Sequence, residues 1–476
     1  MNSNACTCLG GNIMRYLSVC SGIEAATVAW SSLQWTPVAF AEVEPFPSAV
    51  LMHRLGASRP VYPLDPDETE KDRDRDERRR WIKAVDGLPD GGEITNYGDF
   101  RKIGDELYGK VDIVAGGTPC QSYSLAGLRK GLDDPRGKLG IEFVRLCYRT
   151  GAPFFLWENV PGVLSSGKGR DFAGILSGWT GRDVTVPRKG WRNSGIIEPS
   201  GDDSYGVCWR VLDSQYTRVD GYEKAVPQRR RRVFVVGYRG DWRPPAAVLL
   251  EPGGMPGDTA AGPDAGEGVA RTLTSSPGGC SGKEQQHTFI GRDGTPLNPI
   301  CMAHGQSNAE ICQNGGGPTL TCNHEAPVIC YENHPNDSRV TDHGDLSPTL
   351  TGRAGTGGGN LPLVARRSSV RRLLPVETER LQGFPDGWTG IPWRNKYKCG
   401  QCGKIYTDRR RSWADGDAAS CPDCGEKDDL RHHTPDGPRY KAVGNSWAVN
   451  CARWIGRRID KVNKILADQK ERDGRR

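Results

Sequence analysis

The stretch "VDIVAGGTPCQSYSLAG", residues 111–127, joins an apolar run to a turn rich in Gly, Ser and Pro. The run predicts a short buried strand, because strands covered on both faces of a sheet read as continuous apolar segments bounded by turn residues. Cys120 lies in the turn, soon after this strand. A free cysteine is often only a small buried hydrophobic residue, so Cys120 by itself indicates no function. The rest of the sequence has to decide between a structural and a chemical role.

Apolar runs of this kind recur through the first half of the chain and alternate with helical patterns. Strands are predicted at residues 15–19, 37–43, 111–116, 153–160 and 231–238, and a helix around residues 140–149. This alternation is typical of α/β proteins, so we predict a doubly wound, mostly parallel sheet. The densely charged stretch 65–83 is predicted to be a solvated helix or a flexible insertion.

Composition and charge limit the class of protein. The chain has 476 residues, 36% of them apolar, and a net charge of +6, which is too small to indicate nucleic-acid binding by itself. No segment approaches the ~20 apolar residues of a membrane helix, and the first residues lack the pattern of a secretion signal. The 16 cysteines are therefore interpreted as thiols or metal ligands in a reducing cytoplasm.

Polar residues gather where the predicted strands end. The first strand runs into the glycine turn of "SVCSGIEAA", residues 18–26, and Glu42 and Glu44 follow the second strand. Asp99 precedes the third. Ligands of open α/β sheets lie at the carboxyl edge of the strands, where an acidic residue after the second strand commonly binds a ribose. Together these positions predict a cofactor that contains a nucleoside.

The same edge holds residues suited to covalent chemistry. The fourth strand ends at Glu158 and Asn159, and the third leads to Cys120. A thiolate and a carboxyl group at neighbouring strand ends can converge on an electron-poor ring, the thiolate as nucleophile and the carboxyl group as a partner of the ring. The arginines of "PQRRRR", residues 227–232, would then contact phosphates or bases.

Eight sequence motifs, in their sequence and in their order along the chain, resemble those of the DNA (cytosine-5) methyltransferases of bacteria and phages. The motifs are "LSVCSGIEAA", "AEVE", "YGDF", "GGTPCQSYSLAGLRKGLDDPRGKL", "WENVPGVL", "VPQRRRRVFVVG", "RLLPVETERLQGFPDGW" and "AVGNSWAVN". They cover roughly residues 14–240 and 366–460. The stretch between them, about 241–365, occupies the place of the family's variable target-recognition region.

The resemblance implies transfer of a methyl group from S-adenosylmethionine to C5 of a flipped cytosine in a specific DNA sequence. The same resemblance implies that Cys120 attacks C6 of the base and that Glu158 binds N3 and the exocyclic amine. Arg230 and Arg232 are expected to hold the base, Arg232 through O2. Base flipping fits the reaction, because a duplex hides C5 and C6 within its stack. The implied cofactor-binding residues are Gly22, Ile23, Glu42, Asp99, Phe100, Asn445 and Ser446.

We expect the following division of the chain. Residues 1–13 form a disordered extension, with Met14 as the natural start, and residues 14–244 form the catalytic domain of S-adenosylmethionine-dependent methyltransferase fold. Residues 245–365 form a loop-rich β recognition domain, in which a Thr-Leu-Thr phrase recurs three times. Residues 366–395 return to the catalytic domain, 396–428 form an inserted zinc ribbon, and 429–476 complete the catalytic domain with an amphipathic helix.

A metal site is predicted within that insertion. The insertion contains two C-x₂-C pairs, Cys399 with Cys402 and Cys421 with Cys424, and eighteen residues separate the two pairs. Four thiolates at this spacing are typical of a structural, tetrahedral Zn²⁺ site with no open coordination position. The usual methyltransferase core lacks such an insertion, and its role stays open.

Two other functions are considered. One is methylation of cytosine in RNA, which the length of residues 241–365 disfavours, because a dedicated reading domain suits duplex DNA. The other is a catalytically silent DNA-binding relative, which would not need Cys120 or Glu158. We expect double-stranded DNA as the partner and no association with a membrane. We also expect a cytoplasmic monomer in a bacterial or phage-infected cell. Three biological roles stay open: protection against a cognate restriction enzyme, which would then be a partner, shielding of phage DNA, and action as an orphan enzyme.

Overall fold

The computed structural model describes residues 13–69, 71–118, 139–218, 226–250, 289–290, 296–297, 329–333, 340–342, 347–350, 363–366, 369–393, 396–407, 420–425 and 429–473. Three expectations fall outside these residues. They concern residues 1–12 of the extension, the turn that contains Cys120, and most of the recognition domain at 245–365.

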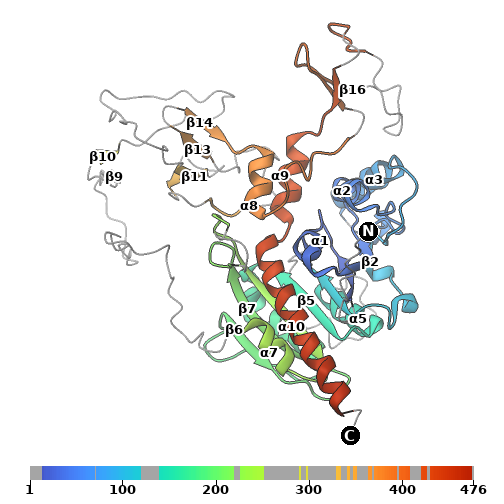
Figure 1. Cartoon of the computed structure of the whole chain (residues 1–476), viewed down its shortest axis with the longest axis vertical. Coiled ribbons are helices and arrows are strands. Elements are labelled where there is room, and N and C mark those ends of the chain that lie inside the picture. The colour runs from blue at the N-terminus through green and yellow to red at the C-terminus, as the bar shows by residue number, and fades with distance from the viewer. Residues whose placement is uncertain are drawn as a thin grey trace, which may run out of the picture.

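An eight-stranded sheet forms the centre of the protein (Figure 1). Its order is β3-β2-β1-β4-β5-β8-β7-β6. The strands are β1 (Arg15–Val19), β2 (Thr36–Ala41), β3 (Thr95–Asn96), β4 (Ile113–Gly116), β5 (Phe154–Asn159), β6 (Ser194–Ile197), β7 (Tyr205–Asp213) and β8 (Arg231–Arg239). The first five pair in parallel, and β8, β7 and β6 add an antiparallel edge. The predicted class, α/β with a mostly parallel sheet, is confirmed.

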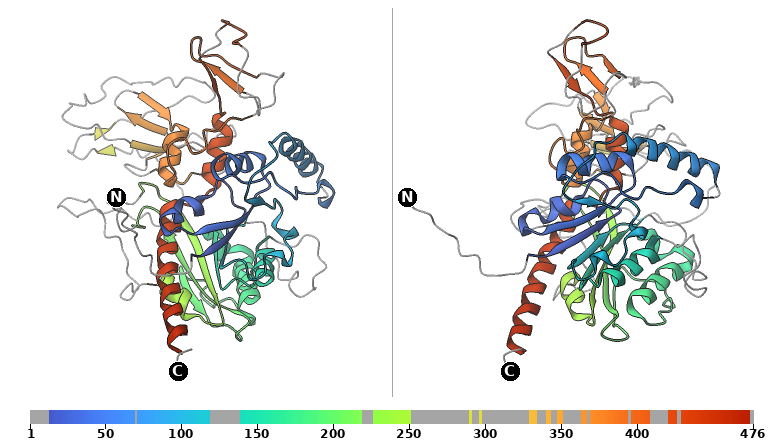
Figure 2. Two further views of the ribbon diagram at one scale, coloured as in Figure 1. Left: turned by 45° about the vertical axis from the view of Figure 1, so that its right-hand side comes forward. Right: turned by 90° about the vertical axis from the view of Figure 1, so that its right-hand side faces the viewer.

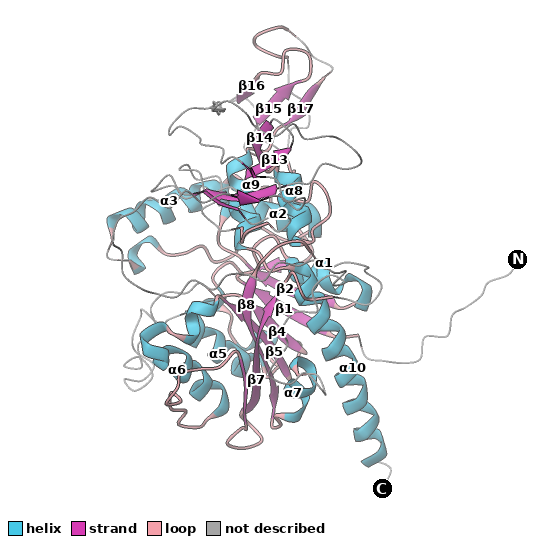
Figure 3. Ribbon diagram, turned by 90° about the vertical axis from the view of Figure 1, so that its left-hand side faces the viewer, coloured by secondary structure: helices cyan, strands magenta, loops and turns pink. Residues whose placement is uncertain are grey.

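Helices cover both faces of this sheet (Figure 3). α5 (Leu139–Thr150) and α6 (Arg170–Thr180) pack on one face, and α1 (Ala25–Trp30), α7 (Arg243–Leu249) and α10 (Val449–Asp473) on the other. The end of the chain thereby packs on its beginning: the indole Nε1–H of Trp30 in α1 donates to the Ala452 carbonyl of α10 over 3.0 Å. Among the described residues, no helix is long and apolar enough to cross a membrane.

The four remaining α-helices lie in the upper half of Figure 1. They are α2 (Pro45–Leu55), α3 (Asp72–Asp86), α8 (Pro375–Gln382) and α9 (Asp436–Asn445), with short 3₁₀ helices at Ser31–Leu33, Pro66–Glu68, Phe100–Lys102, Asp105–Leu107, Pro161–Leu164 and Ser166–Gly169. The charged stretch 65–83 thus contributes to α3, a mostly solvated helix that buries Val85.

Three smaller sheets belong to the second half of the chain. Their strands are β9 (Phe289–Ile290) with β10 (Pro296–Leu297); β11 (Ile329–Asn333), β12 (Val340–Asp342), β13 (Leu363–Arg366) and β14 (Ser369–Arg372); and β15 (Lys396–Cys399), β16 (Ile405–Thr407) and β17 (Leu430–His432). The last three form the ribbon that projects above α9 (Figure 2). Its strand β17 lies beyond the expected boundary at residue 428, and β14 lies beyond the boundary at 365 yet pairs with β13.

Candidate active site

An ion pair lies where β5 ends and β8 begins. Glu158 is 8% exposed, and its Oε1 lies 3.1 Å from Nε of Arg232. The antiparallel register of β5 and β8 pairs Glu158 with Phe234 and brings Arg232 to the carboxyl end of β5. Burial raises the pKa of Glu158, while the charges of Arg232 and Arg230 act in the opposite direction. The pair therefore combines a buried carboxyl group of raised pKa with the adjacent Arg232 guanidinium.

The segment that leads to Cys120 is anchored beside this pair. The Trp157 indole N–H donates to Oγ1 of Thr118 over 2.9 Å, and the Asn159 amide donates to the Thr118 carbonyl over 3.1 Å. A Cβ added to Gly117 would lie 3.1 Å from Oε2 of Glu158. Cys120 itself lies outside the described residues. The last described residues before it thus contact the strand that carries Glu158.

Arg230 contacts backbone carbonyls, whereas Arg232 pairs with Glu158. Its side chain is buried, with the residue 2% exposed, and its guanidinium donates to the carbonyls of Leu350, Gly444 and Ser446. Burial and the nearby Arg232 charge lower the pKa of Arg230 to about 9, which leaves it protonated at neutral pH. These contacts tie the residue to the segment at residues 347–350 and to the end of α9.

A pocket opens at the carboxyl end of β1. It is lined by Ser18, Val19, Cys20, Ser21, Gly22, Glu24, Ala25, Ala26, Gly117, Asn445, Ser446 and Trp447. Three of the predicted cofactor residues, Gly22, Asn445 and Ser446, are thus brought together from opposite ends of the chain. Gly117 belongs to the same lining, so the pocket reaches the segment beside Glu158.

The acidic residues predicted for the cofactor lie next to this pocket. Glu42 accepts the backbone N–H groups of Gly22 and Glu44, each over 2.7 Å. Burial and the Glu44 charge raise the pKa of Glu42 to about 7. Asp99 is buried and accepts from the Arg101 guanidinium. Burial raises the pKa of the Cys20 thiol, and the charges of Glu42 and Asp99 act in the same direction.

Two other predicted cofactor residues, Ile23 and Phe100, are buried in the hydrophobic cores and do not line the pocket with their side chains. Conversely, Glu24 and Trp447 line the pocket but were not among the predicted site residues. Glu24 is 1% exposed, accepts from Oγ of Ser18 over 2.7 Å and from the Thr27 N–H over 3.0 Å, and burial raises its pKa to about 7. A charged residue inside a glycine turn was the available signal.

The four predicted zinc ligands lie together in the ribbon. Their sulfur atoms lie within 4.8 Å of one another, with 3.5 Å between Cys399 and Cys424 and 3.7 Å between Cys402 and Cys421. A tetrahedral ion with Zn–S bonds of about 2.3 Å needs sulfur separations of about 3.8 Å, so the arrangement fits Zn²⁺. After each pair, a glycine with positive φ, Gly403 or Gly425, turns the chain back.

The sequence also matches a known protein family. The sequence pattern of the family described as C-5 cytosine-specific DNA methylase matches residues 91–179 and 187–404. The chain belongs to this family. The matched residues include Glu158, Arg230 and Arg232, and Cys120 also falls within them.

Individual relatives of this methylase cover different shares of it. A protein of Escherichia phage P1, named DNA N-6-adenine-methyltransferase, is 32% identical over 96% of this chain, but this chain spans only 62% of that relative. The type II methyltransferase M.AquIA of Picosynechococcus sp. is 37% identical over 27% of this chain and 44% of its own length. The crystal structure of the S. pombe Dnmt2 methyltransferase covers 95% of this chain and 99% of that chain at 9% identity, with a TM-score of 0.42.

Proposed function

We propose that this protein transfers a methyl group from S-adenosylmethionine to C5 of a cytosine in DNA. The observation that carries the proposal is the buried Glu158–Arg232 pair, which lies beside Gly117 at the start of the segment leading to Cys120. A thiol, a carboxyl group and a fixed cation are what covalent activation of a cytosine ring requires. Membership of the C-5 cytosine-specific family supports the same reaction.

In this proposal each residue has a defined task. The Cys120 thiolate forms a bond to C6, while Glu158 hydrogen-bonds to N3 and Arg232 to O2, which stabilises the charge that moves into the ring. When bound, S-adenosylmethionine supplies an electrophilic methyl group. The C5–CH₃ bond would form as the methyl–sulfur bond of the sulfonium breaks, which leaves the thioether S-adenosylhomocysteine. The C5 proton would then pass to a solvent base as the C6–S bond breaks, which restores the Cys120 thiolate and the aromatic ring. Arg230, whose guanidinium binds three carbonyls, acts as a positioning residue.

The cofactor and the metal are assigned to two separate places. The pocket lined by Gly22, Asn445 and Ser446 suits an adenosine-containing ligand, because it combines backbone groups of a strand–helix turn with the adjacent Glu42 carboxyl group. The four sulfur atoms of the ribbon suit one structural Zn²⁺.

A second candidate function follows from the name of the phage P1 relative, which is an adenine N6 methyltransferase. Methylation of an exocyclic amine needs no thiol nucleophile. The activity that gives the relative its name can reside in the part of it to which this chain has no counterpart. For this reason the cytosine reaction is preferred, and the nature of the product separates the two.

The test is to identify the methylated nucleoside. The full chain is incubated with labelled S-adenosylmethionine and either mixed-sequence DNA or RNA, and the nucleic acid is digested to nucleosides and separated. The proposal predicts label in 5-methylcytosine from DNA. Label in N6-methyladenine, label confined to RNA, or no transfer by folded protein would each contradict it.

A further inference from the structure

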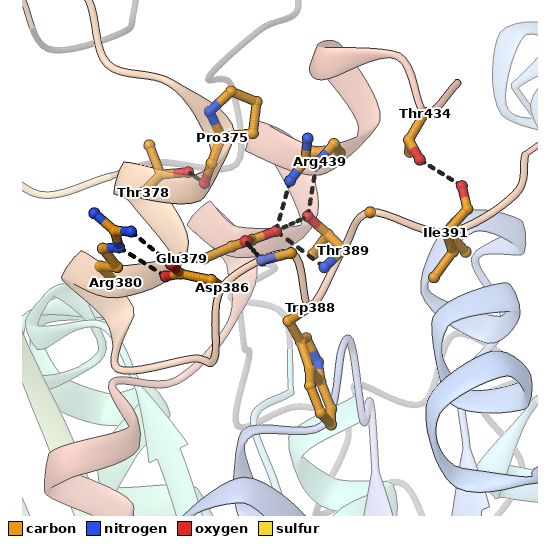
Figure 4. Close-up of polar contacts among 12 residues, drawn as sticks. Pro375, Thr378, Glu379, Arg380, Asp386, Trp388, Thr389, Ile391, Thr434 and Arg439 are labelled. Atoms are coloured by element: carbon orange, nitrogen blue, oxygen red, sulfur yellow. Dashed lines mark hydrogen bonds and ion pairs between the residues drawn. The ribbon is translucent and has the colours of Figure 1, made fainter. Parts of the chain in front are cut away.

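The loop of residues 384–393, "FPDGWTGIPW", connects α8 to the ribbon and reaches the turn beneath the pocket. Trp388 extends from this loop away from α8 and α9 (Figure 4). Its indole Nε1–H donates to the Ile23 carbonyl over 2.8 Å. Ile23 directly follows Gly22, whose backbone lines the pocket. A residue far along the chain thus holds the backbone of the β1–α1 turn.

The backbone on both sides of Trp388 is fixed by one carboxylate. Glu379 of α8, which is fully buried, accepts the N–H of Gly387 over 2.7 Å and that of Thr389 over 2.9 Å. Arg439 of α9 lies 3.0 Å from the same carboxylate (Figure 4). Buried charges remain favourable only when they are paired and fully hydrogen-bonded, as here. The direction in which Trp388 leaves the loop is therefore set by α8 and α9.

A second cation, Arg54, contacts Trp388. Nε of Arg54, near the end of α2, donates to the Trp388 carbonyl over 2.9 Å. The guanidinium also lies over the indole ring, with Cζ 5.8 Å from the ring centroid. It donates in addition to the carbonyls of Gly387 and Gly390. Arg54 thus restrains both the backbone and the ring of Trp388.

The turn that Trp388 contacts needs such support. Cys20, Gly22 and Glu24 have φ values of 48°, 58° and 65°, and this left-handed region is unfavourable for residues other than glycine. Strained backbone of this kind persists only when surrounding contacts hold it. The Ile23 carbonyl, between Gly22 and Glu24, is the point at which Trp388 supplies such a contact.

We propose that Trp388 is a positioning residue for the cofactor, which holds the β1–α1 turn in the conformation that binds S-adenosylmethionine. The inference rests on the proposed function, since it takes the pocket as the cofactor site. Trp388 acts through the Ile23 carbonyl, and Arg54 acts through Trp388. Loss of the indole N–H leaves that carbonyl without its donor and allows the turn to relax toward other conformations.

The test replaces Trp388 by Phe, which keeps an aromatic ring but removes the N–H donor. Binding of S-adenosylmethionine to the full chain without DNA is measured by calorimetry. Loss of this partly buried hydrogen bond predicts a rise in Kd of about fivefold. Trp454→Phe, at a partly buried tryptophan of α10 that does not line the pocket, is the matched control and should leave Kd unchanged. In methylation assays, Trp388→Phe should raise KM for the cofactor more than it lowers kcat.

Arg54→Gln provides an independent variant that leaves Trp388 in place. It should also raise Kd, and its effect should not add fully to that of Trp388→Phe, because the two residues act on the same contact. Equal affinities of wild type, Trp388→Phe and Arg54→Gln would overturn this inference alone. A folded wild-type chain that binds no S-adenosylmethionine would overturn the proposed function and this inference with it.

Discussion

Gly117 is the residue at which the Glu158–Arg232 pair and the pocket beside β1 meet. A Cβ at this position would lie 2.7 Å from Nε1 of Trp447 and 3.1 Å from Oε2 of Glu158. Distances this short require one neighbour to move, and such overpacking typically costs about 1–3 kcal/mol. Glycine is therefore needed here for space, so that Glu158 and Trp447 can both approach the backbone.

Gly117→Ala should for this reason lower the single-turnover methylation rate at least tenfold, since a displacement of about 1 Å in an active site is costly. The rate is measured with saturating DNA and cofactor, together with the melting temperature. Gly201→Ala, at a glycine whose added Cβ meets nothing within 4 Å, is the control. A Gly117→Ala variant with the wild-type rate would show that this contact does not position Glu158.

Glu24 gives a pH dependence of known sign. Burial raises its pKa from an ordinary value of 4.5 to about 7 in the folded chain. Between these two values the folded state binds more protons than the unfolded state, so the contribution of Glu24 to stability falls as the pH rises and is lost above about 7. The Glu24→Gln variant does not titrate at this position.

The free energy of unfolding of Glu24→Gln relative to wild type should therefore increase between pH 5 and pH 8, by up to about 3 kcal/mol. Denaturant unfolding of both proteins at the two pH values measures it, and other titrating groups cancel in the difference. A difference that does not change with pH would mean that Glu24 ionises normally in the folded chain.

Among the smaller elements, the ribbon of β15, β16 and β17 is the clearest independent unit. Its three strands have three or four residues each, too few to be stable without additional support. Thr434, just after β17, donates to the Ile391 carbonyl and closes the base of the ribbon (Figure 4). The four sulfur atoms supply the remaining cross-link if a metal is bound.

Metal analysis of the purified chain should find one zinc per molecule, and Cys421→Ser should lose it and make the ribbon sensitive to proteolysis. Cys147→Ser, at a buried cysteine of α5 outside the cluster, should keep its zinc. Absence of zinc from the wild-type chain, or its retention by Cys421→Ser, would contradict the assignment.

The elements differ in how far they could be predicted. β4 and β5 are buried on both faces, and continuous apolar runs such as "PFFLWENV" identify them directly. β7 was missed, because "YGVCWRVLD" mixes glycine, arginine and apolar residues without a clear period. β8 was found, but its antiparallel direction depends on pairing with β5 and β7, which no local pattern contains.

At the scale of the whole molecule, the candidate site joins the two ends of the chain. Asn445 and Ser446 reach the pocket beside Gly22 because α10 packs on α1 and because α9 is tied to Glu379 through Arg439. The resemblance in the sequence predicted that Asn445 and Ser446 return to the pocket. It did not predict Trp388 or the Glu379–Arg439 pair, because contacts between distant segments leave no spacing in the sequence.

Attack of the Cys120 thiol on cytosine can be tested by trapping the covalent adduct. The full chain is incubated with S-adenosylmethionine and DNA in which every cytosine is 5-fluorocytosine. Fluorine cannot leave C5 as a proton does, so the C6–S bond should persist. We expect a complex that survives denaturation and maps to Cys120 in wild type and Cys147→Ser, and none with Cys120→Ser. Formation of 5-methylcytosine on ordinary DNA without such a complex, or an adduct at another cysteine, would contradict it.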